Sequence, residues 1–326
     1  MSPPKLHVAV ERWPVDGAFT IARGSRTEAV VVTATVSDGR FSGRGEAVPY
    51  ARYGETVDAT LAEIGALDGV SGRDELMARA SAGASRNAVD CAFWDLEAKR
   101  VGRRVWELAG VPAADGRYPT CYTLSLAPAD EMARRAAASR DKSLLKLKLG
   151  GRGDADRMRA VRAARPDARL VVDANESWQP DEFHSLLEVA ASVGVELIEQ
   201  PLPADRDAHL AARPRTVPIC ADESFHTRAD FERVAGLYDA INIKLDKTGG
   251  LTEALATARM ARERGLRIMV GCMLSTSLAM APAAVLAPFA DWLDLDGPLL
   301  LSRDREPAVS YLGGSIVLPT PIGLWG

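Results

Sequence analysis

The chain has 326 residues, of which 47% are hydrophobic and 26% charged, and its formal net charge is −4. This composition is typical of a globular protein, and the length suits an α/β barrel with an accessory domain. The absence of a net positive charge argues against nucleic acid as a partner. No run approaches the roughly 20 apolar residues that a membrane-spanning helix needs, so we expect no membrane partner either.

The first residues lack an apolar stretch followed by a small-residue cleavage site, so the sequence predicts no signal peptide. The four cysteines show no paired spacing, which is typical of reduced thiols. Both observations indicate a cytoplasmic protein.

The N-terminal part of the chain begins with strand patterns and continues with helical ones. Residues 6–11 alternate between apolar and polar, residues 29–36 are rich in β-branched side chains, and Asp38-Gly39 predicts a hairpin turn after them. From Thr56 onward the periodicity is helical, with Thr56 and Ser85 as expected N-caps of two helices. Strands followed by helices predict a separate α+β domain, which we place at residues 1–115.

From residue 116 to 304, short apolar strands alternate with helical stretches. A helix is expected from Pro180, and a capping box is expected at Thr227. Eight such strands predict a (β/α) barrel, whereas an open dinucleotide-binding sheet would need a Gly-x-Gly-x-x-Gly motif after its first strand. The expected strands are residues 121–124, 144–149, 170–173, 196–199, 219–222, 240–244, 267–271 and 292–296.

Beyond the barrel, residues 310–318 contain Gly313-Gly314 and predict a hairpin. We expect the C-terminal segment, residues 305–326, to return to the N-terminal domain.

The second barrel strand carries two lysines, Lys146 and Lys148, on one face. A solvated edge strand would explain them simply. Apolar neighbours and the Gly150-Gly151 turn instead favour an interior strand, in which two ammonium groups need anions nearby.

Acidic and basic residues recur at the carboxyl ends of the strands, where barrel enzymes carry their active sites. A single acid in such a place is often an N-cap of the next helix. Acids at the ends of successive strands, with lysines on both sides, favour one shared site instead. The residues concerned are Lys146, Lys148, Asp173, Glu199, Asp222, Lys244, Asp294 and Asp296.

Three carboxylates without His or Cys select a hard divalent cation, and Mg²⁺ fits better than Zn²⁺. Lysines on either side of the metal are placed to move a proton, and an ammonium that is desolvated near a cation has a lowered pKa.

Long motifs in this chain resemble those of the enolase superfamily, in particular its muconate lactonizing enzyme subgroup and the dipeptide epimerases of the L-Ala-D/L-Glu type. The similarity extends over the whole chain and implies a modified TIM barrel with an α+β capping domain. The motifs are VDANESW (172–178), EQPLP (199–203), ICADESFHTR (219–228), INIKLDKTGGLTEA (241–254), GCML (271–274) and DLDGP (294–298).

The resemblance implies Mg²⁺-dependent epimerisation of a dipeptide, most simply L-Ala-L-Glu and L-Ala-D-Glu, by two-base proton transfer through an enediolate. It also implies a place in murein peptide metabolism. Carried over to this sequence, Asp173, Glu199 and Asp222 would bind Mg²⁺. Lys148 and Lys244 would be the two bases, and Lys146 would stabilise the enolate.

The same resemblance assigns the substrate contacts. Asp294 and Asp296 would hold the free ammonium of the dipeptide, although Asp296 could simply cap the turn at Gly297-Pro298. Arg23 or Arg26 of the capping domain would reach the distal carboxylate, although a loop arginine is usually just solvated. Further substrate contacts would come from Thr123 and Cys272, and assembly into a homo-oligomer is compatible with the sequence.

Two alternatives stay open. The same scaffold supports o-succinylbenzoate synthesis or a cycloisomerisation, against which the Asp294 and Asp296 pair argues. A non-catalytic ligand-binding barrel is the other alternative, but mere binding would need neither lysine base.

Overall fold

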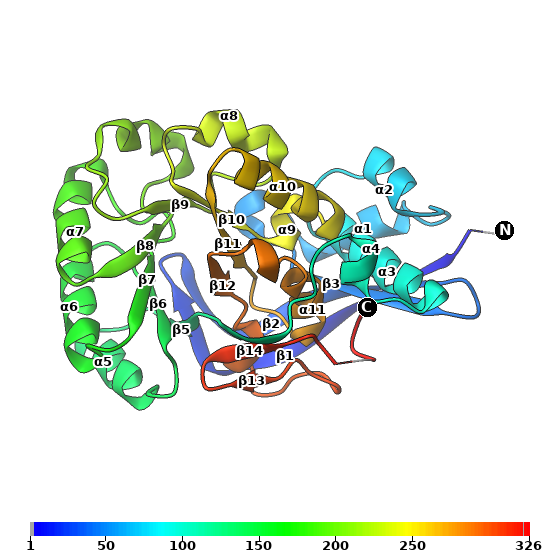
Figure 1. Cartoon of the computed structure of the whole chain (residues 1–326), viewed down its shortest axis with the longest axis horizontal. Helices are drawn as coiled ribbons and strands as arrows, with labels where there is room; N and C mark the ends of the chain where they lie inside the picture. The colour runs from blue at the N-terminus through cyan, green and yellow to red at the C-terminus, as the bar shows by residue number, and fades with distance from the viewer. Residues whose placement is uncertain (1–2, 322) are drawn as a thin grey trace.

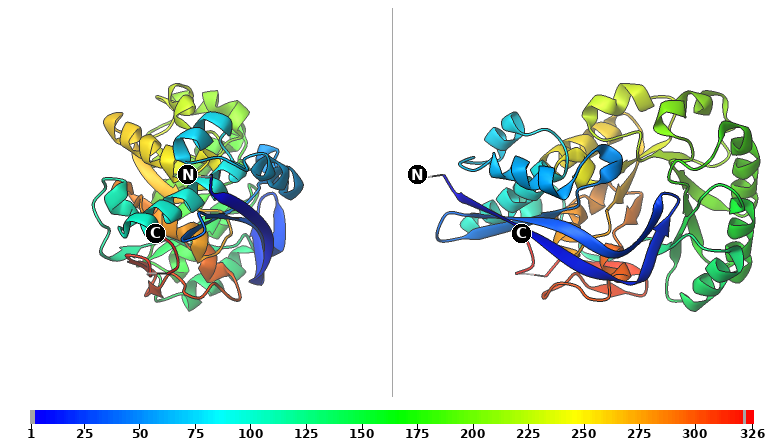
Figure 2. Two further views of the ribbon diagram at one scale, coloured as in Figure 1. Left: turned by 90° about the vertical axis from the view of Figure 1, so that its right-hand side faces the viewer. Right: turned by 180° about the vertical axis from the view of Figure 1, so that it is seen from behind.

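The structure is a computed structural model that describes residues 3–321 and 323–326. Its N-terminal part is a three-stranded antiparallel sheet, which carries helices on one side (Figures 1 and 2). The strands are β1 (Lys5–Ile21), β2 (Gly24–Ser37) and β3 (Ser42–Ala47), and the helical elements are η1 (Ala51–Tyr53), α1 (Val57–Gly65), α2 (Arg73–Arg79), α3 (Ala84–Val101) and α4 (Val105–Leu108). The predicted succession of strands and helices is therefore present.

In the N-terminal domain, two of the local turn and cap predictions are confirmed and one is wrong. The Asp38 carboxylate accepts hydrogen bonds from the backbone N–H groups of Arg40 and Phe41, which closes the β2–β3 hairpin. The Thr56 hydroxyl caps α1, as expected. The prediction for Ser85 was wrong, because α3 begins at Ala84 and the distant Glu55 carboxylate accepts from the Ala84 N–H at 2.8 Å.

The second part of the chain is the predicted eight-stranded parallel barrel, in which neighbouring strands follow the order of the sequence. The ring closes where Thr120 bridges Leu293 in parallel fashion and the Cys121 N–H donates to the Leu293 carbonyl at 2.8 Å. The strands are β5 (Tyr122–Leu124), β6 (Leu144–Lys148), β7 (Arg169–Asp173), β8 (Val195–Glu199), β9 (Ile219–Ala221), β10 (Ala240–Ile243), β11 (Arg267–Gly271) and β12 (Trp292–Asp294).

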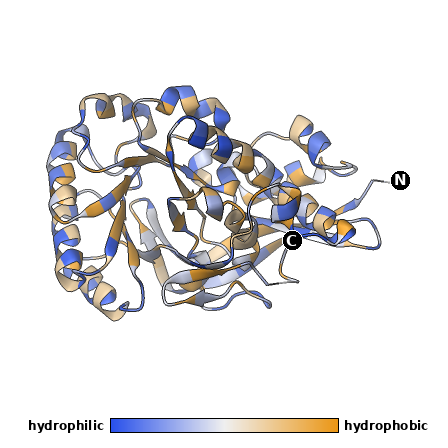
Figure 3. Cartoon of the chain, in the orientation of Figure 1, coloured by the Kyte–Doolittle hydropathy of each residue, from blue (hydrophilic) through white to orange (hydrophobic). Residues whose placement is uncertain are grey.

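Helices surround the barrel and show hydrophobic and hydrophilic residues side by side, as amphipathic helices do (Figure 3). The helix expected from Pro180 is α7, which has that proline in its first turn. The capping box at Thr227 is also present. The elements are α5 (Ala129–Ala138), α6 (Asp154–Ala164), α7 (Pro180–Ser192), η2 (Ala204–Ala212), η3 (Arg228–Asp230), α8 (Phe231–Val234), α9 (Leu245–Thr248), α10 (Leu251–Glu263), α11 (Ser277–Ala284), η4 (Ala287–Phe289) and η5 (Gly297–Leu300).

A C-terminal hairpin follows the barrel, with Gly313 and Gly314 at its turn, as predicted. Its strands β13 (Tyr311–Leu312) and β14 (Ser315–Leu318) form a small sheet with β4 (Gly116–Pro119). Past the hairpin, the Trp325 indole donates to the Cys91 carbonyl of α3 at 3.0 Å. The end of the chain thus packs against the N-terminal domain.

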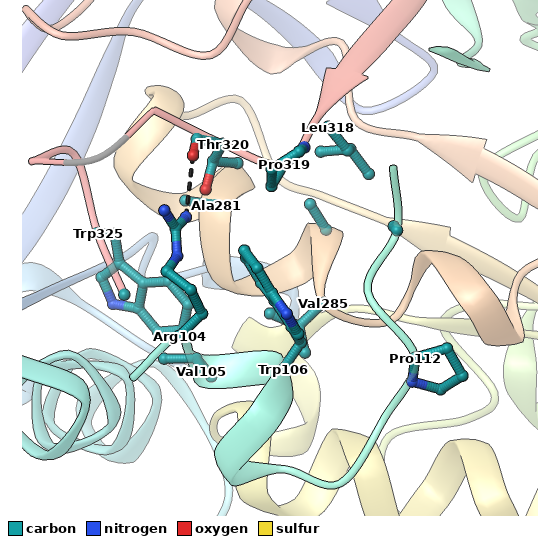
Figure 4. A pocket seen from close by; sticks show the side chains of 13 residues that line it. Arg104, Val105, Trp106, Pro112, Ala281, Val285, Leu318, Pro319, Thr320 and Trp325 are labelled. Carbon is teal, nitrogen blue, oxygen red and sulfur yellow. Dashed lines mark hydrogen bonds between the residues drawn. The ribbon is translucent and has the colours of Figure 1, made fainter. Parts of the chain in front are cut away.

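A small apolar pocket lies at this junction, between α4, α11 and the C-terminal segment (Figure 4). Trp106 and Trp325 line it, and Arg104 donates to the Thr320 carbonyl at 2.9 Å. Its volume of about 20 Å³ has room for about one water molecule, so it is no substrate site.

Each of the eight positions around the ring contributes one apolar side chain, and together these side chains fill the lower interior of the barrel. We call this set the inner apolar layer; it consists of Cys121, Leu144, Val171, Leu197, Cys220, Ala240, Met269 and Trp292. In the described residues, no helix is long and apolar enough to cross a bilayer.

Candidate active site

A second layer of side chains lies directly above the inner apolar layer, toward the carboxyl ends of the strands. Side chains alternate faces along a strand, so the residue two positions after each apolar one points to the same interior. We call these residues the charged layer; they are Thr123, Lys146, Asp173, Glu199, Asp222, Asn242, Gly271 and Asp294.

Lys146 lies in the centre of this layer and is 1% exposed. Its ammonium lies 2.6 Å from Glu199 Oε2, 2.6 Å from Asp294 Oδ2 and 3.3 Å from Asp173 Oδ2. Burial alone would lower the pKa of Lys146, but the three carboxylates outweigh burial and hold this pKa well above its ordinary value. Strand β6 lies between β5 and β7, so the edge-strand alternative is excluded.

Lys148 and Lys244 flank the carboxylates on opposite walls of the barrel. Strands β6 and β10 are four positions apart in the closed ring, and the Lys244 side chain follows directly after β10. The Lys148 ammonium donates to Asp173 Oδ2 at 2.6 Å, and that of Lys244 donates to Asp222 Oδ2 at 2.7 Å. Both lysines line one pocket of about 160 Å³.

The acids Asp173, Glu199 and Asp222 come from the strand ends between these two lysines and are at most 1% exposed. Burial would raise the pKa of Asp173, but Lys148 and Lys146 lower it below its usual range. The pKa of Asp222 is lowered in the same way by Lys244 and Lys247, whereas burial and Asp173 raise the pKa of Glu199.

The donor set of these acids fits a hard divalent cation such as Mg²⁺, because it consists of carboxylate oxygens alone. Glu199 Oε2 is buried and faces the Lys146 ammonium at 2.6 Å, so this oxygen already has a cation as its partner. The lysine ammonium groups lie between the carboxylates in this structure, and within the described ranges no three acids, histidines or cysteines are grouped closely enough to hold a metal as they stand.

Asp222 has a second lysine partner, Lys247, which the sequence analysis did not single out. The Lys247 ammonium donates to Asp222 Oδ1 at 2.6 Å, to the Asp222 carbonyl at 2.7 Å and to the Asn242 carbonyl at 2.9 Å. It follows Lys244 by one helical turn of α9 in the INIKLDK motif, a spacing that could have revealed it.

Strained backbone positions follow two of the acids. Asn175, Glu176 and Gln200 have positive φ angles of 46°, 67° and 34°, which residues other than glycine rarely adopt. The Gln200 side-chain oxygen accepts from the Asp222 N–H at 2.9 Å, so this unusual turn ties the end of β8 to the end of β9.

Asp294, at the end of β12, and Asp296, just after it, line a small pocket together with Thr123, Lys148 and Cys272. Asp296 Oδ2 accepts from the Thr123 N–H at 2.6 Å and makes no cap bond to the following turn, so the turn-cap alternative is wrong. Burial and the neighbouring Asp294 raise the pKa of Asp296 to about 7. Asp294 Oδ1 is buried and receives no hydrogen bond from any described residue.

The β1–β2 hairpin extends from the N-terminal sheet to the barrel (Figure 2). Arg23 and Arg26, at the end of this hairpin, line the pocket at the mouth of the barrel. Arg23 is held by four barrel and loop partners: Glu223 at 2.7 Å, Glu176 at 3.3 Å, the Tyr50 hydroxyl at 3.0 Å and the Asn175 carbonyl at 2.9 Å. Arg26 lies over the Tyr50 ring at 5.5 Å and forms no ion pair with the described part of the chain. Both arginines line the pocket between Lys148 and Lys244.

Comparison with known proteins identifies the class of this barrel. Residues 5–110 match the mandelate racemase / muconate lactonizing enzyme N-terminal domain, and residues 129–324 match the enolase C-terminal domain-like family. The chain therefore belongs to the mandelate racemase and muconate lactonizing enzyme branch of the enolase superfamily.

Individual relatives show which members of this family the chain is similar to. The chain is 44% identical to the L-Ala-D/L-Glu epimerase of Escherichia coli K12, over 96% of this chain and 99% of that protein. An Agrobacterium tumefaciens enolase family member with homology to dipeptide epimerases, solved with sodium and L-Ala-L-Glu, superposes with a TM-score of 0.96 at 50% identity and covers 99% of this chain and 100% of its own. The Enterococcus faecalis dipeptide epimerase, solved with Mg and L-Leu-L-Tyr, has a TM-score of 0.90 at 28% identity, covering 100% and 99%.

Proposed function

We propose that this protein catalyses the Mg²⁺-dependent epimerisation of a dipeptide at the α-carbon of its second residue, with L-Ala-L-Glu and L-Ala-D-Glu as the favoured pair. The observation that carries the proposal is the pair of buried lysines on opposite barrel walls, with three carboxylates between them. Epimerisation removes a proton from one face of a carbon and adds one to the other, so it needs two such groups.

Asp173, Glu199 and Asp222 are the residues that would hold Mg²⁺. When bound, the cation would stabilise the negative charge that develops as the α-proton leaves, and it would replace the lysines as partner of the carboxylates. Lys148 then takes or returns the proton on one face, and Lys244 does so on the other. The buried charge of Lys146 adds to the stabilisation from the side of Glu199 and Asp294.

Lys244 needs a different arrangement from the one seen here to act as a base. Burial alone would lower the pKa of Lys244, but Asp222 and Glu199 raise it well above its ordinary value. The lowered pKa expected from the sequence is thus not a property of Lys244 while it is paired with these acids. Loss of the bond to Asp222 would leave desolvation as the dominant effect, which favours the neutral amine that a base needs.

The substrate ammonium has a matching anionic site in Asp294 and Asp296. Asp294 Oδ1 has an unused acceptor position in the pocket, and a charge-assisted hydrogen bond there fixes the amino end of the dipeptide. Thr123 and Cys272 line the same pocket and would contact the substrate between its two ends.

The side chain of the second residue would meet the hairpin of the capping domain. Because Glu223 and Glu176 already neutralise Arg23, we assign the glutamate carboxylate of the substrate to Arg26. Arg23 instead fixes the hairpin tip that carries Arg26. The free thiols of all four cysteines support the cytoplasm as the compartment of this reaction.

The deciding experiment follows α-proton exchange in D₂O by NMR for L-Ala-L-Glu, L-Ala-L-Phe and N-acetyl-L-Ala-L-Glu. We expect exchange and epimerisation of the first compound, with kcat/KM at least ~10-fold lower when the free amine is blocked. Equal rates with and without the amine would remove the role of Asp294 and Asp296, and a preference for Ala-Phe would remove that of Arg26. Binding without any exchange would favour the non-catalytic barrel, and turnover of o-succinylbenzoate precursors would favour the other chemistry of the scaffold.

A further inference from the structure

The charged layer contains two positions without charge next to one another, Asn242 on β10 and Gly271 on β11. These strands are paired, with Asn242 opposite Met269, so Gly271 lies one inward-facing position further along. Asn242 is 0% exposed, and its amide donates to Glu199 Oε1 at 2.7 Å. A Cβ atom on Gly271 would lie 2.5 Å from Asn242 Oδ1 and 2.8 Å from Nδ2. The amide therefore occupies the space that a side chain at position 271 would fill.

The carboxylate of Glu199 is held differently from those of its neighbours, because one of its oxygens is bound by a neutral amide. Asp173 accepts hydrogen bonds from Lys148 and the Asn175 N–H, and Asp222 accepts them from two lysines. The Asn242 amide donates to Glu199 Oε1 at 2.7 Å. The Lys146 ammonium lies 2.6 Å from the other oxygen, Oε2, so the amide holds Oε1 while Oε2 faces a cation.

The orientation of the amide follows from simple chemistry. With its oxygen toward Glu199, Asn242 would place two acceptors against each other, so the NH₂ group must face the carboxylate. Asn242 Oδ1 then faces Gly271 and has no hydrogen-bond donor among the described residues. A buried acceptor without a partner is unusual, which indicates that the hydrogen bond from the NH₂ group to Glu199 compensates for it.

We infer that Asn242 and Gly271 form a positioning pair: the glycine leaves the space in which the amide holds Glu199 Oε1, so that Oε2 is directed to the centre of the site. This inference rests on the proposed function, in which Glu199 is a metal ligand. Asn242 is a positioning residue, because it acts on the metal through Glu199. Partners of this kind commonly change metal affinity by about 10- to 100-fold when they are lost.

The test measures the Mg²⁺ dissociation constant of metal-free protein by calorimetry, together with the rise in Tm on adding Mg²⁺. Asn242→Leu keeps the shape of the side chain and removes the donor, so we expect Mg²⁺ binding to weaken by about 10- to 100-fold. Gly271→Ala should weaken it in the same range, because the new methyl group displaces the amide. In both variants, saturating Mg²⁺ should restore most of kcat, which would not happen if the change merely damaged the fold.

The double variant tests whether Asn242 and Gly271 act together on Glu199. Once Asn242→Ala has removed the amide, a methyl group at position 271 has nothing to displace, so Asn242→Ala/Gly271→Ala should bind Mg²⁺ as Asn242→Ala does. Gly65→Ala in α1 is the matched control, since no atom lies within 4 Å of its added Cβ, and it should bind Mg²⁺ like the parent.

The outcomes separate this inference from the proposed function. Parental protein that binds no Mg²⁺ would overturn both. Parental protein that binds Mg²⁺, with Asn242→Leu or Asn242→Ala within about twofold of it, would overturn the positioning role alone. Fully additive losses in the double variant would overturn the coupling between Asn242 and Gly271.

Discussion

The inner apolar layer and the charged layer occupy the same eight positions around the barrel, two residues apart along each chain segment. Leu144 lies below Lys146, Val171 below Asp173, and Leu197 below Glu199. The lower layer is fully packed with apolar side chains, whereas the upper one carries buried opposite charges. One step of strand alternation therefore separates the residues that hold the barrel together from those that give it chemistry.

The two layers show how a barrel can hold a buried ionic site. The apolar layer seals the floor, so the charges above it lose water on one side and interact more strongly. Each ammonium is then matched by a carboxylate, which limits the cost of burial. Substitutions in the lower layer should consequently change stability alone. Substitutions in the upper layer should change activity and, where they leave a carboxylate without its counter-ion, stability as well.

Lys148→Ala is expected to have the largest effect on activity. Loss of one base should lower the rate of epimerisation by about 10²- to 10⁴-fold in both directions. Exchange of the α-proton with D₂O should survive for the epimer that faces Lys244, and Lys244→Ala should leave the opposite exchange. Polarimetry and NMR measure the two quantities separately. A single variant that epimerises at nearly the parental rate would contradict the two-base arrangement.

Lys146→Met should lower the free energy of unfolding by different amounts with and without Mg²⁺. Without Mg²⁺, Asp173, Glu199 and Asp294 lose their shared counter-ion, so the free energy of unfolding should fall by about 3 to 5 kcal/mol. With saturating Mg²⁺, the cation compensates two of these acids and the loss should be smaller. Urea unfolding with EDTA and with Mg²⁺ gives both values. An equal loss in both conditions would argue against Asp173 and Glu199 as ligands.

Leu197→Ala tests the lower layer alone. Removal of this fully buried side chain should reduce the free energy of unfolding by about 2 to 5 kcal/mol through lost contacts and a cavity. The Mg²⁺ dissociation constant and kcat of the folded fraction should stay within about twofold of the parent. A loss of activity larger than the loss of folded protein would show that the two layers are not independent.

The smallest effect concerns pH. Because an ammonium binds to the ionised form of Asp296, whose pKa is raised to about 7, the KM for L-Ala-L-Glu should fall as the pH rises from 6 to 7.5. The ionised fraction of such a group grows roughly eightfold over this range, and KM should fall by no more than that factor. Asp296→Asn should show a higher KM with little dependence on pH, and an unchanged dependence in that variant would assign the titration to another group.

The sequence predicted the barrel and the upper layer well, because both depend on local repetition. Strand alternation places Lys146 and Lys148 on one face, and a strand–helix repeat brings Asp173, Glu199 and Asp222 to one end of the barrel. These features follow from short stretches of chain, so they can be read without knowledge of distant contacts.

The remaining residues depend on contacts between distant segments, which the sequence does not reveal. Ser85 lost its expected role as a cap because Glu55, far away in the chain, already accepts the first N–H of α3. Arg23 resembles any loop arginine until Glu223 and Glu176 are brought to it. Asn242 looks like an ordinary strand residue in the sequence, because its proposed role depends on the space that Gly271 leaves by lacking a side chain.

The contact between Lys146 and Asp294 has a consequence for the order of folding. These residues are 148 positions apart, and the ring closes only when β12 meets β5. Contacts of such long range form slowly, because closing the intervening chain costs conformational entropy before the contacts themselves add any stability. During synthesis, a growing chain that has not yet reached β12 would present Lys146 without its last counter-ion. Catalytic competence is therefore expected to arise late and all at once, as the final strand docks.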